Sequence, residues 1–226
     1  KKDLSSIDLI VEERLKGKPL AYLIGKKGFW KNSFIVTPDV LVPRPETETL
    51  VDAILNENLQ GKTILELGTG SGAISISIAQ ENKDCFIFAT DISIKSILVA
   101  KQNAAKFCCE NIIFLNHDWN NEWLFPQVDY LISNPPYVDK EATSGKEEGI
   151  WHEPEIALFS KDKGLSDLKL ILSKGKNFLN ENGKVYLEHA PDQYEELNKF
   201  AEENGYLNFS NLNDLNGDKR VSIYQC

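Results

Sequence analysis

Four consecutive residues, Asn134-Pro135-Pro136-Tyr137, have the types that could hold a planar amino group for chemistry. The Asn134 side-chain oxygen and the Pro135 carbonyl can each accept a hydrogen bond from an –NH2 group, and the prolines keep the backbone rigid. Tyr137 offers a flat face on which an amide or a base can stack. An amide nitrogen is a poor nucleophile, and two accepted hydrogen bonds would orient it and raise its electron density. We therefore predict that these four residues form the catalytic and substrate-binding element.

A second candidate group lies in the glycine-rich loop Glu66–Gly72 and at Asp91. Glycines let the backbone approach a ligand closely, and a following helix would offer free N–H groups. A carboxylate at Asp91 could accept the hydroxyls of a ribose. A dinucleotide would use the first two glycines and Ala73, whereas S-adenosylmethionine would use all three, with Glu66 near its cationic end. The spacing favours S-adenosylmethionine, because this cofactor is positively charged and has no pyrophosphate.

The elements that must position these residues alternate between strand and helix from residue 62 onward. The predicted strands are 63–67, 85–90, 112–115, 128–133 and 184–188, and the predicted helices are 46–55, 73–80, 94–107, 165–179 and 193–204. Segments 207–210 and 220–224 are typical of a terminal hairpin. This order predicts an α/β fold with a doubly wound, Rossmann-like, seven-stranded and mostly parallel sheet that ends in a C-terminal antiparallel hairpin.

The N-terminal part has a different pattern. Residues 1–20 predict one weakly amphipathic helix, and β-like runs at 20–24 and 33–37 predict a hairpin before Pro43-Arg44-Pro45 breaks the chain. We predict a unit of helix and hairpin linker at 1–45 and the cofactor-binding domain at 46–226. The long irregular stretch 137–164 is expected to close over the site, since loops of this length in compact domains are usually functional or disordered.

Composition and charge narrow the classes of function. The chain has 226 residues and a formal net charge of −9, which is poorly suited to a phosphate backbone. This charge disfavours a nucleic-acid partner as a substrate. No apolar run approaches the roughly 20 residues of a membrane span, so we expect no membrane partner. The four cysteines and three histidines show no metal-ligand spacing, so we expect no metal site and a cytoplasmic protein with reduced thiols. The sequence contains no Met, so we expect it to be part of a longer protein.

Taken together, these motifs resemble those of the release-factor glutamine methyltransferases, the HemK/PrmC family. The resemblance covers nearly the whole chain from Arg14 onward. It rests on Arg14-Leu15, Pro19–Gly25, Leu41–Glu48, Glu66–Gly72, Asp91-Ile92-Ser93, Ser133–Tyr137, Glu153-Pro154 and Ala157-Leu158. The N-P-P-Y sequence alone is shared with adenine-N6 DNA methyltransferases and some RNA methyltransferases. Its pairing with P-R-P-E-T-E is far more specific to the glutamine enzymes.

The resemblance implies methyl transfer from S-adenosylmethionine to the side-chain amide nitrogen of the glutamine in the Gly-Gly-Gln motif of peptide chain release factors. The implied cofactor contacts are Glu66, Gly68, Thr69, Gly70, Ser71, Gly72, Asp91, Ile92, Asp118, Trp119 and Asn134. The implied substrate contacts are Asn134, Pro135, Pro136 and Tyr137, with Arg44 and Glu46 at the mouth of the site. A surface salt bridge stays open as an alternative for Arg44 and Glu46, a core position for Trp119, and a plain turn for Glu153-Pro154.

The sequence departs from the family pattern in two places. The family carries a larger N-terminal helical bundle, so residues 1–45 are expected to hold only its last helix. It also usually shows Glu-x-Gly where this chain has Glu188-His189-Ala190, a change that we expect the backbone to tolerate. The alternative function is an N6-adenine or other exocyclic-amino DNA or RNA methyltransferase with the same N-P-P-Y pocket. A non-catalytic cofactor-binding partner and a dinucleotide oxidoreductase are weaker alternatives, and we expect a monomer.

Overall fold

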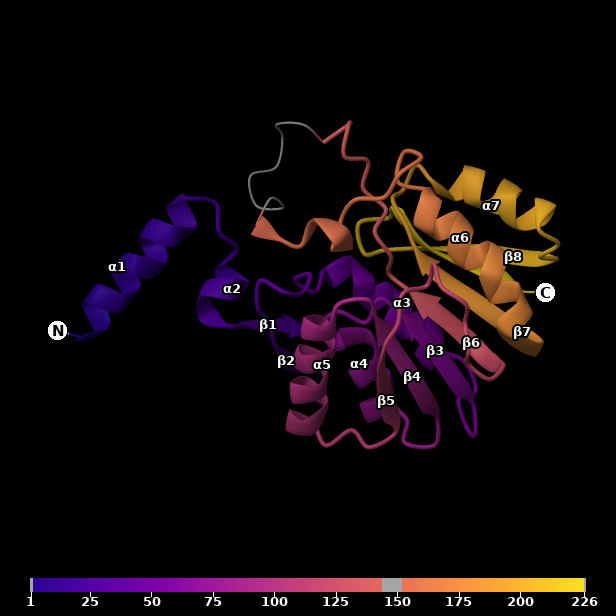
Figure 1. The fold of residues 1–226 in the computed structure, drawn as a ribbon, viewed down its shortest axis with the longest axis horizontal. Helices are drawn as coiled ribbons and strands as arrows, with labels where there is room; N and C mark the ends of the chain where they lie inside the picture. Colours follow the sequence, from indigo (N-terminus) through magenta and orange to yellow (C-terminus); the bar gives the residue numbers. More distant parts are fainter. Residues whose placement is uncertain (1, 144–151, 226) are drawn as a thin grey trace.

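The computed structural model describes residues 2–143 and 152–225 (Figure 1). Its helices are α1 (Lys2–Leu15), α2 (Leu20–Ile24), α3 (Glu48–Leu55), α4 (Ala73–Glu81), α5 (Ile94–Lys106), α6 (Ser166–Gly175) and α7 (Tyr194–Glu203). Its strands are β1 (Lys26–Phe29), β2 (Asn32–Ile35), β3 (Thr63–Leu67), β4 (Phe86–Asp91), β5 (Ile112–Asn116), β6 (Val128–Ser133), β7 (Leu179–Glu188), β8 (Asn208–Asn213) and β9 (Lys219–Gln225). Short 3-10 helices are η1 (Pro45–Thr47), η3 (Glu155–Ala157) and η4 (Lys176–Phe178).

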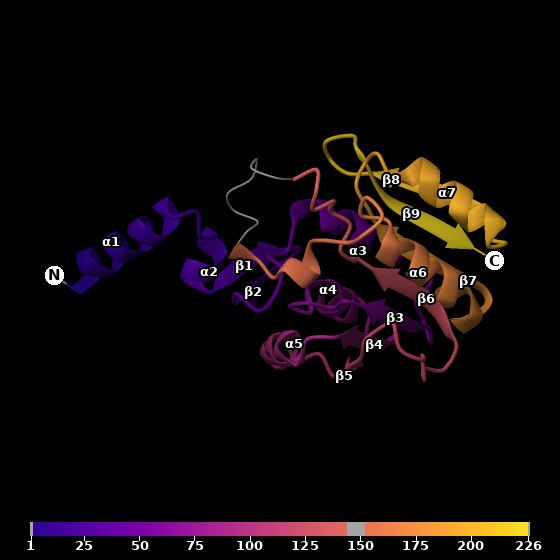
Figure 2. The same cartoon turned by 45° about the horizontal axis from the view of Figure 1, so that its top comes forward.

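The main sheet has seven strands in the order β5-β4-β3-β6-β7-β9-β8 (Figures 1 and 2). Strands β5 to β7 of this order pair in parallel, whereas β9 is antiparallel to both β7 and β8. The predicted seven-stranded α/β fold with a C-terminal antiparallel hairpin is therefore confirmed. The strand order reverses between β3 and β6, and ligand crevices in such sheets lie at the carboxyl ends of the strands on either side of this switch.

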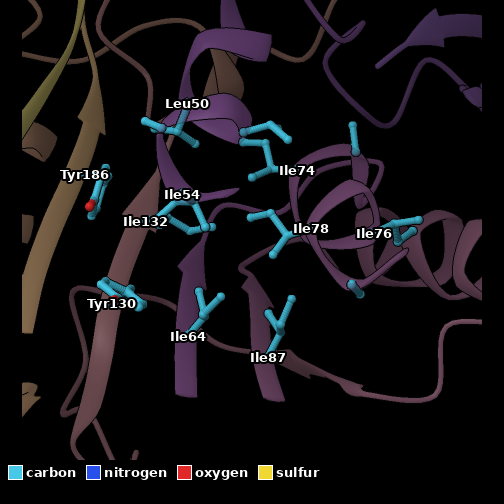
Figure 3. Close-up of a cluster of buried hydrophobic side chains, with 14 of the residues drawn as sticks. Leu50, Ile54, Ile64, Ile74, Ile76, Ile78, Ile87, Tyr130, Ile132 and Tyr186 are labelled. Atoms are coloured by element: carbon cyan, nitrogen blue, oxygen red, sulfur yellow. The ribbon is translucent and has the colours of Figure 1, made fainter. Parts of the chain in front are cut away.

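Alternate residues of the central strands face two separate hydrophobic layers, as the twofold repeat of a strand requires. On one face, Ile64, Ile87 and Ile132 pack with α3 and α4 (Figure 3). On the other face, Leu65, Leu67, Leu131 and Val185 pack under α6 and α7. Both layers are buried and closely packed, so the strands hold the loops at their ends in fixed positions.

The N-terminal segment is arranged differently from the prediction in one respect. Residues 20–24 form helix α2 and not a strand, so the hairpin consists of β1 and β2. A short apolar run does not distinguish strand from helix, and the flanking residues decide the outcome here. Pro19 precedes the first turn, and Gly25 ends the helix with a left-handed φ of 69°.

Helix α1 projects away from the sheet, whereas the hairpin joins the main core (Figures 1 and 2). Phe29 and Phe34 of the hairpin are buried in the layer that contains α3 and α4. A small third cluster holds Val36, Val40 and Val42 of the following linker against α5. The linker that leads from the hairpin to α3 is thus packed against the main domain, and the division at residue 45 stays a prediction.

The other predicted elements lie close to their observed positions, with one shift. Strand β7 begins at Leu179, earlier than the predicted 184, because α6 ends at Gly175 and only η4 separates the two. The middle of the stretch 137–164, residues 144–151, lies outside the described residues, and with it the predicted closure. On either side of this gap, Val138 and Phe159 form an isolated parallel bridge. Across the described part of the chain, no helix is long and apolar enough to cross a membrane.

Candidate functional site

A cavity of about 310 Å³ lies at the carboxyl ends of β3, β4, β5 and β6, at the switch in strand order. The linker before α3 and the segment around η3 close its other side. The lining residues are Pro38, Asp39, Val40, Leu41, Gly68, Gly70, Asp91, Ile92, Ser93, Ser96, Asp118, Trp119, Asn120, Asn134, Pro136, Pro154, Ile156, Ala157, Phe159 and Asp167. The sheet topology therefore brings the two predicted motifs, the glycine loop and the N-P-P-Y element, to one cavity.

The glycine loop needs its glycines for two different reasons. Gly68, Gly70 and Gly72 all have a left-handed backbone, with φ of 75°, 56° and 81°. A Cβ at Gly72 would lie 2.7 Å from Ile76 Cδ1, so this position packs the loop against α4 and α5. A Cβ at Gly70 would meet nothing within 4 Å, and Gly70 lines the cavity. Gly72 thus serves packing, whereas Gly70 leaves room for a ligand.

Glu66 anchors the loop from below and does not line the cavity. Its side chain is fully buried and accepts hydrogen bonds from the Thr69 hydroxyl at 2.6 Å and from the Ser75 hydroxyl. Burial raises the pKa of Glu66 to about 7, and the two hydroxyls oppose that rise. Its Oε1 atom has no hydrogen-bond partner among the described residues. An acidic group with spare accepting capacity therefore lies directly beneath the loop.

Asp91 lies at the end of β4 and lines the cavity. Its Oδ2 accepts the Gly70 N–H at 2.9 Å, and its Oδ1 accepts the Ser93 N–H at 2.8 Å. Burial raises the pKa of Asp91, and these two backbone donors act in the opposite direction. Each oxygen retains accepting capacity, so the fixed carboxylate can receive two hydroxyl groups from a ligand.

Trp119 forms a wall of the cavity directly beside the glycine loop. Its ring edge lies 3.2 Å from the point where a Cβ at Gly68 would stand, and its Nε1 donates to Asp167 Oδ1 at 3.1 Å. The Lys174 ammonium holds the backbone below the ring by donating to the carbonyls of Trp119, Asn120 and Asn121. The side chain is only partly buried and also contacts the core below α6, so it is both wall and core.

The N-P-P-Y element follows β6 and is held from behind. The Asn134 Nδ2 donates to the Thr47 hydroxyl at 3.0 Å, and the Tyr137 hydroxyl donates to Glu188 Oε1 at 3.0 Å. Burial raises the pKa of Glu188 to about 7, opposed by the nearby hydroxyls of Thr47 and Tyr137. Burial and the adjacent Glu188 raise the pKa of Tyr137 beyond its ordinary range, so its hydroxyl stays protonated.

Arg44 and Glu46 lie beside the cavity without lining it. The Arg44 guanidinium pairs with Glu153 Oε1 at 2.5 Å, and Glu153 Oε2 accepts the Val42 N–H at 2.9 Å. The Glu153 side chain is only 2% exposed, so this pair is more than a surface salt bridge. It joins the linker before α3 to the segment that contains η3, and these two segments form the outer wall of the cavity.

The charge of the cavity selects among cofactors. Four carboxylates line it, from Asp39, Asp91, Asp118 and Asp167, and no Lys, Arg or His is found among the lining residues that the structure describes. Lys95 pairs with Asp39 at 3.0 Å from the exposed side, which leaves the other three without a lysine or arginine ion pair in the described chain. Such a site repels a pyrophosphate and attracts a cationic ligand. S-adenosylmethionine, with its sulfonium and ammonium groups, fits these residues, and a dinucleotide does not.

Half of the predicted site residues line the cavity and half lie outside its lining. The lining members are Gly68, Gly70, Asp91, Ile92, Asp118, Trp119, Asn134 and Pro136. The members outside the lining are Glu66, Thr69, Ser71, Gly72, Pro135, Tyr137, Arg44 and Glu46. Within residues 2–143 and 152–225, no group of three or more His, Cys, Asp or Glu side chains is arranged to hold a metal ion.

The structure adds residues that the sequence analysis did not assign to the site. Segment 38–41 and the residues Ile156, Phe159 and Asp167 line the cavity, and Thr47 and Glu188 support the N-P-P-Y element. Thr47 lies inside the P-R-P-E-T-E sequence, which was a usable signal for a role near the site. Nothing in the local sequence marks residues 38–40 or Phe159, because only the fold brings them to the strand ends.

Comparisons with known proteins agree with this geometry. Residues 45–152 match the family model of the methyltransferase small domain. The chain is 35% identical over 225 residues to a release factor glutamine methyltransferase of Aliivibrio fischeri, covering 99% of this chain and 79% of the relative. It is 38% identical over 224 residues to a release factor glutamine methyltransferase of Coxiella burnetii, covering 96% of this chain and 79% of the relative.

Among solved structures, a methyltransferase from Pyrococcus furiosus superimposes with a TM-score of 0.62 at 20% identity, covering 85% of this chain and 87% of its own. At that identity the likeness shows the fold alone, whereas the sequence relatives show the family. The chain therefore belongs to the release factor glutamine methyltransferases, a family of S-adenosylmethionine-dependent enzymes.

Proposed function

We propose that this protein transfers a methyl group from S-adenosylmethionine to the side-chain amide nitrogen of the glutamine in the Gly-Gly-Gln motif of a peptide chain release factor. The observation that carries this proposal is one cavity that joins an acidic, glycine-lined half to the N-P-P-Y element at the switch in strand order. An acidic pocket suits the cationic cofactor, and the adjoining amide and carbonyl acceptors suit a planar –NH2 group.

The proposed cofactor contacts divide into direct and supporting residues. Asp91 is positioned to accept the ribose hydroxyls, while Gly68 and Gly70 let the ligand approach the loop. Trp119 and Asp118 would flank the adenine, and Ile92 borders the same side. Glu66 acts from below the loop together with Thr69, Ser71 and Gly72, which shape the backbone. S-adenosylmethionine supplies, when bound, a methyl group made electrophilic by its sulfonium.

The proposed substrate contacts come from the N-P-P-Y element. The Asn134 Oδ1 and the Pro135 carbonyl would accept the two amide protons of the glutamine and turn its nitrogen toward the methyl group. Pro136 lines the cavity at the same place and fixes the backbone. Tyr137 stands behind it, where its ring supports the element. Arg44 and Glu46 keep the outer wall in place at the mouth through Glu153 and the start of α3.

The alternative substrate, an exocyclic amino group of DNA or RNA, could use the same two acceptors. The chain's net charge of −9 and the acidic cavity disfavour a polyanionic partner. We further propose that the enzyme works as a monomer in the cytoplasm, where release factors act. Residues 46–226 are proposed to carry the chemistry, with residues 1–45 as a remnant of a helical domain and linker that contribute to substrate contact.

The proposal is tested by transfer of labelled methyl groups from S-adenosylmethionine to a purified release factor. Label is expected on the wild-type factor and not on a factor whose Gly-Gly-Gln glutamine is changed to Ala. The variant Asn134→Ala should lose at least about 100-fold in kcat, because it removes an acceptor that orients the nitrogen. Label on DNA or RNA, with none on the factor, would replace the proposed substrate with the alternative one.

Cofactor binding is measured separately from turnover. S-adenosylhomocysteine binding, followed by calorimetry, should be detectable for wild type and for Asn134→Ala, because the glycine loop and Asp91 hold the nucleoside. If neither protein binds this ligand, the cofactor assignment is wrong, whatever the result with the release factor.

A further inference from the structure

The two polar side chains of the N-P-P-Y element converge on one buried carboxyl group. Tyr137 donates directly to Glu188 Oε1 at 3.0 Å, and Asn134 donates to Thr47 at 3.0 Å. The Thr47 hydroxyl also lowers the pKa of Glu188, so it lies near this carboxyl group. Glu188 is fully buried and Thr47 is 4% exposed, so no solvent competes for these contacts.

The chemistry of these groups gives the network a direction. In its ionised form Glu188 can only accept hydrogen bonds, so it accepts the Tyr137 hydroxyl and favours a Thr47 hydroxyl whose proton points toward it. A Thr47 hydroxyl that donates its proton toward Glu188 can only accept a hydrogen bond from Asn134. The Asn134 side chain must then turn its –NH2 group toward Thr47, which leaves Oδ1 on the side of the cavity that Asn134 lines.

Glu188 has spare accepting capacity and two charged neighbours. Its Oε2 atom has no hydrogen-bond partner of ordinary geometry among the described residues. Arg220 of β9 is the charged group that favours the ionised form, and Glu46 of η1 is the one that opposes it. Buried polar groups without full partners are costly and are retained mainly where they set specificity or function.

We propose that Thr47 and Glu188 are positioning residues that fix the flip of the Asn134 amide, so that its oxygen and not its nitrogen faces the substrate amide. The wrong flip would present two donors to the substrate's own –NH2 donors, and the nitrogen would not be held. Glu188 also accepts the hydrogen bond from the Tyr137 hydroxyl, so Thr47 and Glu188 together hold the first and last residues of the N-P-P-Y element. This inference rests on the proposed function of Asn134 as an acceptor.

The test compares Thr47→Val, which removes the hydroxyl and keeps the shape, with Thr47→Ser, which keeps the hydroxyl. We expect Thr47→Val to lower kcat for methylation of the release factor about 10-fold, the effect of one lost hydrogen bond. Thr47→Ser should stay within about threefold of wild type, and both variants should bind S-adenosylhomocysteine as wild type does. A purely structural role would lower the two variants alike or change thermal stability without changing kcat.

A matched control removes a neighbouring hydroxyl that is outside the network. Ser133 precedes Asn134, and its hydroxyl donates to the Leu67 carbonyl at 2.7 Å. Ser133→Ala should lower stability but leave kcat within about twofold of wild type. If Ser133→Ala lowers kcat as much as Thr47→Val does, local packing explains the effect and the positioning role is wrong.

The link to Glu188 is tested with a double-mutant cycle. Glu188→Gln places an –NH2 donor in the network, so it should lower kcat about 10-fold as well. In the Thr47→Val background, Glu188→Gln should cost much less than it does alone, because the path to Asn134 is already broken. Fully additive losses would show that the two residues act separately and would overturn the proposal.

A measurement without substrate separates this proposal from the proposed function. The Asn134 side-chain amide protons, assigned by their absence in Asn134→Asp, should exchange slowly in wild type and in Thr47→Ser. They should exchange faster in Thr47→Val. This pattern with no methylation of the release factor would reject the substrate and keep the network, whereas equal exchange in all three proteins would reject the network itself.

Discussion

The two halves of the cavity are built in different ways. On the glycine-loop side, the key hydrogen bonds join residues that are close in the sequence. Glu66 accepts from Thr69 and Ser75, 3 and 9 positions away, and Asp91 accepts from Gly70, 21 positions away. On the N-P-P-Y side, Asn134 and Tyr137 bind partners 87 and 51 positions away. Glu153 of the outer wall binds Val42 across 111 positions.

This difference has a physical meaning. The glycine loop and its acidic partners belong to one β-α-β unit, so neighbouring strand ends bring them together as soon as that unit forms. The substrate side depends on the linker before α3, on β7 and on the segment around η3, which meet only in the complete fold. We therefore expect changes on the first side to act on cofactor binding and local folding, and changes on the second side to act on the assembly of the site.

The largest expected effect is on the local side, at Asp91. Asp91→Ala removes the carboxylate that accepts hydrogen bonds from the Gly70 and Ser93 N–H groups and would accept hydrogen bonds from the ribose hydroxyls. Affinity for S-adenosylhomocysteine should fall about 100-fold, since the ribose hydroxyls lose a charged acceptor. Calorimetry measures this loss. The exposed Asp84, in the turn before β4, is the control, and Asp84→Ala should bind as wild type does.

Two glycines with similar backbones separate conformational strain from packing. Gly61 and Gly72 have φ of 67° and 81°, but only at Gly72 would a Cβ meet a neighbour, Ile76 Cδ1 at 2.7 Å. Gly61→Ala should cost about 1–2 kcal/mol of unfolding free energy from the left-handed φ alone. Gly72→Ala adds overpacking and should cost about 3 kcal/mol or more. Equal losses in denaturant unfolding would mean that α4 moves aside without cost.

On the remote side, the buried pair at Glu153 is compared with an exposed pair. Glu153→Gln leaves Arg44 and the Val42 N–H with a weaker partner and should cost about 2 kcal/mol. Glu155→Gln breaks an exposed ion pair with Lys140 and should cost less than about 1 kcal/mol. Denaturant unfolding measures both. A larger loss in Glu155→Gln would show that the outer wall is not joined through Glu153.

The smallest effect concerns pH, and Glu66 and Glu188 predict it with the same sign. Burial raises the pKa of each to about 7, above the value of 4.5 for an ordinary Glu. A raised pKa means that the folded state binds the extra proton, so this stability is fully present below about pH 4.5 and is lost as pH rises through about 7. Each group should remove about 1–2 kcal/mol between pH 5.5 and 7.

Glu66→Gln isolates one of these two contributions. Between pH 5.5 and 7, Glu66→Gln should lose about 1–2 kcal/mol less unfolding free energy than wild type does, because Glu66 no longer titrates. Glu188, the half-buried His117 and the buried His189 titrate in both proteins, so their contributions cancel in this difference. Chemical denaturation at a series of pH values measures it. An unchanged slope in Glu66→Gln would indicate that Glu66 stays ionised in the folded protein and that the Thr69 and Ser75 hydroxyls outweigh its burial.

Most of the fold follows from the sequence, and the exceptions have identifiable causes. The strands 63–67 and 128–133 have the predicted bounds, because buried parallel strands are continuous apolar runs with clear ends. Residues 20–24 were wrongly predicted as a strand, because five apolar residues fit either period and Pro19 and Gly25 favour a helix. The end of α6 and the start of β7 were displaced because a 3-10 turn replaced the expected loop.

The sequence by itself determined the motifs, their order and the family, since glycines, Asn134-Pro135-Pro136-Tyr137 and P-R-P-E-T-E are local patterns with local physical reasons. Only the tertiary structure decided which of these residues line the cavity and which support it from behind. Tyr137 and Arg44 proved to be partners of the buried Glu188 and Glu153 outside the cavity lining. The physical reason is that burial, which decides both the pKa of a carboxyl group and the direction of its hydrogen bonds, depends on contacts between distant segments that no local pattern encodes.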